Sequence, residues 1–138
     1  MIKTFRGQLA DGDQERLRLG TTRGKMGYKI VKFQIIPDAV AGTRNSVMSI
    51  WKVKQDSIVQ GVDFTKANLL GVAAWYNGTY EVDDVVVFDN EIFNQDIYIG
   101  LHDSEGDTVC NYYLELEVIP LSDMAAEYTT IKDLRSNA

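Results

Sequence analysis

Residues 111–119 read NYYLELEVI, and this stretch decides the fold class. Leu114, Leu116 and Val118 alternate with two glutamates, so an extended chain points its apolar side chains to one face and its acidic side chains to the other. Strict period-two alternation predicts a β-strand with one face in a core and the other toward water. Such half-buried strands are typical of antiparallel sheets.

The same alternation recurs along the chain and predicts eight strands. Turn-forming stretches separate them, among them residues 11–13, Asn77-Gly78 and residues 103–107. Eight short strands with frequent turns predict an all-β, antiparallel, jelly-roll-like β-sandwich. The predicted strands are Ile2–Leu9, Glu15–Leu19, Tyr28–Ile36, Val47–Lys54, Leu69–Tyr76, Val85–Phe88, Asp96–Leu101 and Asn111–Ile119.

The face of each strand follows from its pattern. In the third strand, Val31, Phe33 and Ile35 share the face opposite Lys32 and Gln34. In the fourth, Trp51 and Val53 share the face opposite Lys52 and Lys54. The expected core between the two sheets comprises Phe33, Trp51, Ile97, Ile99, Leu114 and Leu116.

The pattern changes after residue 121, where a short C-terminal α-helix is expected. Ser122 is a suitable N-cap, and Ala125, Tyr128, Ile131 and Leu134 recur at three-residue spacing. This modest apolar stripe either closes one end of the sandwich or docks on a neighbouring copy. We therefore expect one domain, with a sandwich over residues 1–121 and a helix or tail over residues 122–138.

Charge is distributed unevenly along the chain, whose net charge is −6. Residues 1–66 hold twelve of the fourteen lysines and arginines, whereas residues 67–131 hold thirteen acids and no lysine or arginine. Two arrangements fit this count. Either the two halves interleave in space and neutralise each other, or each copy has a basic and an acidic face and copies meet head to tail.

The residues that carry chemistry are few. His102 and Cys110 are the only histidine and the only cysteine, so one chain cannot build a tetrahedral zinc site, and a catalytic triad would depend on His102 alone. Cys110 is expected to be buried and inert. A calcium loop at Asp103, Glu105 and Asp107 is conceivable, but a solvated turn is the better interpretation. The paired Glu115 and Glu117 are explained by an exposed strand face. We therefore predict no enzyme, no metal and no cofactor.

Binding partners are limited by the same composition. The chain has no run of apolar residues long enough to span a membrane, no signal peptide is recognised, and its acidic balance argues against direct nucleic-acid binding. The composition fits binding to other proteins better than binding to nucleic acid or to a membrane. The expected interface residues are basic side chains, two aromatics that would supply an apolar centre, and part of the helix stripe: Arg16, Arg18, Lys29, Lys32, Trp75, Tyr76, Tyr128 and Ile131.

Several segments carry a family resemblance that extends over nearly the whole chain. They are residues 2–12, 27–34, 50–53, 87–98, 110–117 and 130–135, of which VFDNEIFNQDIY and CNYYLELE are the most distinctive. In these segments the chain resembles a group of small virion structural proteins of marine tailed phages. They are strand and turn motifs, so the resemblance transfers no catalytic residue.

The resemblance implies a phage virion structural protein, located in the virion and assembled in the host cytoplasm. The expected role is capsid decoration, cementing or completion, through contacts with other copies of the chain and with the major capsid protein or another virion protein. The alternative is a β-sandwich at the tail tip or on a fibre that binds a receptor or a glycan.

Overall fold

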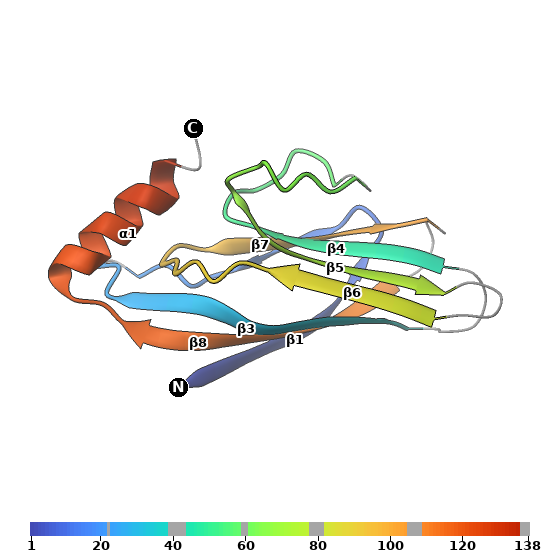
Figure 1. Cartoon of the computed structure of the whole chain (residues 1–138), viewed down its shortest axis with the longest axis horizontal. Helices are drawn as coiled ribbons and strands as arrows, with labels where there is room; N and C mark the ends of the chain where they lie inside the picture. Colours follow the sequence, from blue (N-terminus) through green and yellow to red (C-terminus); the bar gives the residue numbers. More distant parts are fainter. Residues whose placement is uncertain (22, 39–43, 59–60, 78–81, 105–108, 136–138) are drawn as a thin grey trace.

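The computed structural model describes residues 1–21, 23–38, 44–58, 61–77, 82–104 and 109–135. Two antiparallel sheets lie face to face, and a helix lies across one end of them (Figure 1). Within the described residues the elements are β1 (Ile2–Ala10), β2 (Gln14–Leu17), β3 (Met26–Pro37), β4 (Arg44–Trp51), β5 (Leu69–Asn77), β6 (Val82–Phe88), β7 (Ile97–Asp103), β8 (Val109–Pro120) and α1 (Asp123–Arg135).

The strand order identifies the sandwich as jelly-roll-like, as the alternation predicts. One sheet has the order β1-β8-β3 and the other β2-β7-β4-β5-β6. The pairs β1–β8, β2–β7 and β4–β5 are those of a long antiparallel hairpin rolled into two layers. The remaining pair of such a hairpin, β3 with β6, is replaced by pairing of β6 with β5.

The core lies between the sheets and consists of the inward residues of both. Phe33, Ile97, Ile99, Leu114 and Leu116 are fully buried, which confirms five of the six predicted core positions. Met48, Ile50 and Leu101 complete the same layer. The alternation in residues 111–119 thus identifies the inward face of β8 correctly, because β8 is the central strand of its sheet.

Two predicted faces are wrong, and a shift of strand register causes each error. A bulge between Ile30 and Lys32 puts Ile30 in the core and leaves Val31 only half-buried. A second shift between Ile50 and Trp51 ends β4 there, so Trp51 is half-buried while Lys52 is buried. One extra residue in a strand reverses every side chain that follows it.

The topology interleaves the basic and acidic halves of the chain. The acidic β8 lies between β1 and β3, and β2 pairs with β7. Ion pairs join the halves, such as Lys29 with Glu117 at 3.7 Å and Lys25 with Asp123 at 2.7 Å. Much of the charge asymmetry is therefore neutralised within one molecule, which is the first of the two arrangements considered above.

The predicted turns lie partly outside the described residues. Outside the described residues are Gly78 of the expected Asn77-Gly78 turn, and Glu105 and Asp107 of the calcium loop considered above. The predicted cap of the helix is confirmed, because Ser122 Oγ accepts a hydrogen bond from the backbone N–H of Ala125 at 3.2 Å.

Candidate functional site

The junction between α1 and the sandwich is the most polar buried region in the described part of the chain. Asn94, in the segment between β6 and β7, is completely buried there. Its side-chain Nδ2 donates to the Gly24 carbonyl at 2.9 Å and to Thr130 Oγ1 at 2.7 Å. Its backbone N–H donates to Asp133 Oδ2 at 2.9 Å. One residue thus ties three segments that are remote in sequence.

A cluster of four charged residues reinforces this junction. Lys52 and Asp133 have side chains that are only 4 % and 1 % exposed, and their Nζ and Oδ1 atoms lie 3.6 Å apart. Lys52 Nζ also donates to Glu91, which contacts Lys132 Nζ at 3.1 Å. Lys132 in turn donates to the carbonyl of Ile92 at 2.7 Å. The helix therefore docks through ion pairs and hydrogen bonds.

The environment shifts the two carboxyl groups of this cluster in opposite directions. Burial raises the pKa of Asp133 above its ordinary value, and its hydrogen bond from Asn94 and the nearby lysines only partly offset that. Burial also acts to raise the pKa of Glu91, but the hydrogen bonds from Lys52 and Lys132 outweigh it and lower that pKa. Oδ1 of Asp133 accepts no hydrogen bond among the described residues and is held by ion pairing alone.

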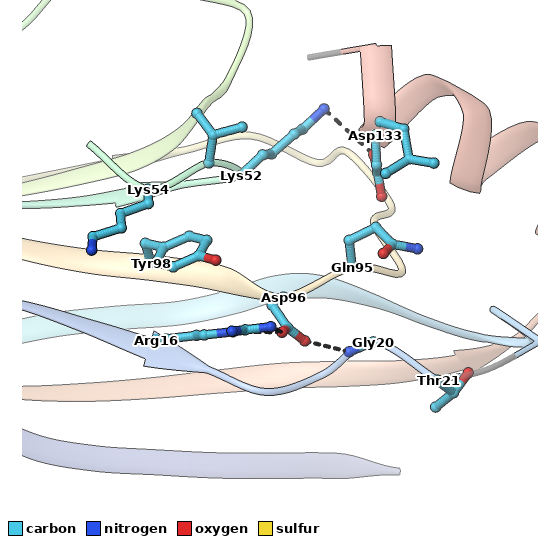
Figure 2. Close-up of a pocket in the computed structure, with 11 residues that line it drawn as sticks. Arg16, Gly20, Thr21, Lys52, Lys54, Gln95, Asp96, Tyr98 and Asp133 are labelled. Carbon is cyan, nitrogen blue, oxygen red and sulfur yellow. Dashed lines mark hydrogen bonds and ion pairs between the residues drawn. The ribbon is translucent and has the colours of Figure 1, made fainter. Parts of the chain in front are cut away.

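A pocket of about 510 Å³ opens beside this cluster (Figure 2). Lys52 and Asp133 line it near α1, and Arg16, Lys54, Asp96 and Tyr98 line it near the sandwich.

Within this pocket, Asp96 fixes the segment that follows β2. It accepts hydrogen bonds from the backbone N–H groups of Leu19 at 2.8 Å and Gly20 at 2.7 Å, and from Arg16 Nε at 2.7 Å. Burial opposes these bonds, but together they outweigh it and lower the pKa of Asp96. The charged groups thus serve mainly to hold one another in place.

This polar docking determines which face of α1 meets the solvent. Ala126, Thr129 and Asp133 face the sandwich and are buried. The opposite face carries the α1 stripe, which we define as Met124, Tyr128, Ile131 and Leu134; all four are more than half exposed. Three of the four residues of the expected stripe belong to it, whereas Ala125 is half-buried and lies outside it. The stripe does not close the end of the sandwich, because the polar face of the helix does so.

A second exposed apolar surface lies on the outer face of the larger sheet. Val85 and Val87 of β6 and Tyr76 of β5 point away from the core there, and each is about half exposed. Phe64 is also exposed and lines a pocket of about 420 Å³ together with Val87. Natural domains seldom leave such groups of large apolar side chains in water without a binding role.

The expected interface residues do not form one surface. Tyr128 and Ile131 lie together on the α1 stripe, and Tyr76 lies on the exposed sheet face. Trp75 is partly buried and packs against the core, because it lies on the inward face of β5.

The four basic residues of that set are divided between the two sheets. Arg16 lies on β2 and Arg18 directly follows that strand, whereas Lys29 and Lys32 lie on β3 of the other sheet. Lys32 Nζ lies 5.5 Å above the centre of the Tyr113 ring, within the molecule. The fold thus disperses these four basic residues over two sheets.

Sequence reasoning missed the residues that build the junction, namely Lys52, Glu91, Asn94 and Asp133. The one available signal was the spacing of Ala126, Thr129 and Asp133, which places them on a single face of the helix. That face is too polar to indicate a buried surface. The expected burial of Cys110 is confirmed.

No protein-family model matches the sequence, and no curated protein matches it either. Among the described residues no cluster of three or more histidine, cysteine or acidic side chains is placed to hold a metal ion. None of the described helices is long and apolar enough to cross a membrane.

Proposed function

We propose that this chain is a non-enzymatic structural protein of a phage particle, and that it decorates, cements or completes the capsid through protein–protein contacts. The family resemblance in the sequence suggests the particle. The observation that carries the proposal is the orientation of α1, which buries its polar face and presents its apolar stripe to the solvent.

That orientation is specified by the junction. Reversing the helix would bury the α1 stripe, but it would break the bonds of Asn94 and leave Lys52 and Glu91 without Asp133 and Lys132. Buried charges that lose their partners cost several kcal/mol, about as much as burial of two or three large apolar side chains provides. The polar cluster therefore keeps the stripe available for a partner.

The stripe suits a groove on another protein. Amphipathic helices commonly bind by placing apolar residues at helical spacing into a hydrophobic groove. Tyr128, at 69 % exposed, and Ile131, at 55 %, lie near the middle of α1 and would form the centre of such a contact. The acidic first turn, which carries Asp123, would help to orient it.

The test is quantitative mass spectrometry of purified particles that carry this chain. We expect a copy number comparable to that of the capsid shell subunit. We also expect the protein to be bound to the head shell, so that it is lost together with the shell. A few copies that copurify with isolated tails would instead favour the receptor- or glycan-binding alternative. Absence of the chain from purified particles would overturn the proposal.

A further inference from the structure

The strand β6 has a free edge, and it is the least protected edge of the sandwich. It pairs with β5 in continuous register from Gly71↔Phe88 to Asn77↔Val82, and with no other strand in the described part of the chain. An unpaired strand edge offers backbone N–H and C=O groups to any strand that approaches it. Val85 and Val87 add exposed apolar side chains beside that edge.

The other three sheet edges carry features that discourage pairing. The edge strand β3 has a bulge between Ile30 and Lys32, and β2 is only four residues long. The edge strand β1 carries the exposed bases Lys3 and Arg6, which discourage pairing with a neutral or basic strand but not with an acidic one. Bulges, short strands and charged side chains are the usual protections of sheet edges, whereas β6 has no lysine, no proline and no register shift, and its two acids discourage only acidic or neutral strands.

Charge selects the partner of this edge. The strand β6 contains two acids and no base, so two copies of β6 repel each other. The strand β1 contains two bases and no acid, and its nine residues are enough to cover the seven of β6. Of the other edges, β2 is too short to cover β6 and β3 is interrupted by its bulge. We infer that the free edge of β6 binds the free edge of β1 from a second copy of this chain.

The two edges are placed for contacts that propagate. Across the core β1 packs against β7, whereas β3 packs against β5 and β6, so β1 and β6 lie on opposite sides of the sandwich. A contact between unlike surfaces on opposite sides is heterologous, and it produces a ring or an open row of copies. This inference rests on the proposed function as an assembly protein and adds to it the neighbour and the type of symmetry.

Sedimentation velocity of the purified full-length chain tests this inference. We expect association that increases with concentration up to the millimolar range, passes beyond the dimer, and weakens when the salt is raised from about 0.05 to 0.5 M, since the screening length shortens about threefold. A monomer at all concentrations, or a dimer that does not grow further, would overturn the inference.

A matched pair of substitutions identifies the edge. Val85→Lys should abolish association, because it replaces an exposed apolar side chain beside the free edge of β6 with a base that the two bases of β1 repel. Ile36→Lys is the control, because Ile36 is 54 % exposed on the outer face of β3 and Val85 is 56 % exposed. If both variants, or neither, lose association, β6 is not the contact.

A charge exchange identifies the partner strand. Asp84→Lys and Lys3→Glu should each weaken association about fivefold or more, because each places like charges in the contact, and the double variant should recover most of the loss. Additive losses in the double variant would rule out β1 as the partner. If the chain is monomeric but still present in particles, this inference fails while the proposed function stands. If the chain self-associates but is absent from particles, the proposed function fails while this inference stands.

Discussion

Replacing Lys52 by methionine removes an ammonium group that has almost no contact with solvent. Methionine fills a similar volume, so the change is mainly electrostatic. Asp133, whose side chain is 1 % exposed, would keep Lys132 at 4.0 Å as its ion-pair partner. Glu91 would keep its ion pair with Lys132 at 3.1 Å. Loss of one partner from a buried ion pair typically costs about 3–5 kcal/mol. We expect Lys52→Met to lower the free energy of unfolding by about that amount.

A double-mutant cycle separates this interaction from the loss of packing. Asp133→Asn keeps an oxygen for the N–H of Asn94, so its own cost should be only about 1–2 kcal/mol. Once Asp133 is neutral, Lys52→Met no longer leaves an unpaired charge there, and the two costs should fall short of their sum by about 1–3 kcal/mol.

The assay is urea unfolding at pH 7, followed by circular dichroism, with Lys54→Met as the control. Lys54 is exposed and has no ion pair among the described residues, so its replacement should change stability by less than about 0.5 kcal/mol. The reasoning would be refuted if Lys52→Met matched the Lys54→Met control, or if the costs of Lys52→Met and Asp133→Asn were simply additive.

Three further predictions concern the core, the loss of stability at acid pH and the junction of α1 with the sandwich. Leu114→Ala should cost about 2–5 kcal/mol in urea unfolding, because Leu114 is fully buried between the sheets; an unchanged midpoint would contradict the assignment of its face. Asp96 has a folded-state pKa below its unfolded value, so its stabilisation is present above the unfolded pKa of about 3.9 and is lost as the pH falls through the folded one. Asp96→Asn should accordingly flatten the loss of stability between about pH 5 and pH 3, and an unchanged slope would show that Asp96 does not contribute. Gly24→Ala should cost at least about 1 kcal/mol and expose α1 to proteolysis, since Gly24 has φ +63° and an added Cβ would lie 2.7 Å from Asn94 Nδ2; normal protease resistance would refute this.

The strands and most of the core were predictable from the sequence, because alternation is a local property. It identifies the inward face of β8 through Leu114 and Leu116, and that of β7 through Ile97 and Ile99. It fails where the register shifts, as at Val31 and Trp51, because the strand on the other side of the shift determines whether an extra residue is accommodated.

The junction was not predictable, because its residues come together only in the folded chain. The spacing of Tyr128, Ile131 and Leu134 indicates an apolar helical stripe, but from the sequence alone this stripe could lie either against the sandwich or on a neighbouring copy. The opposite face is buried because Asn94 and Lys52, 39 and 81 residues before Asp133, offer it hydrogen bonds and an ion pair. The dispersal of the basic residues has a similar cause, since the strand order separates β2 from β3.

The central claim, that the outward α1 stripe joins this chain to a particle, is tested most directly by counting bound copies. Particles assembled with the Tyr128→Glu and Ile131→Glu double variant should be compared with wild type and with Ile36→Glu, an exposed apolar position on β3. Tyr128 and Ile131 are both more than half exposed, so we expect the double variant to keep a urea midpoint close to that of the wild type but to be lost from particles, while Ile36→Glu stays bound. Full occupancy by the folded double variant would contradict the account.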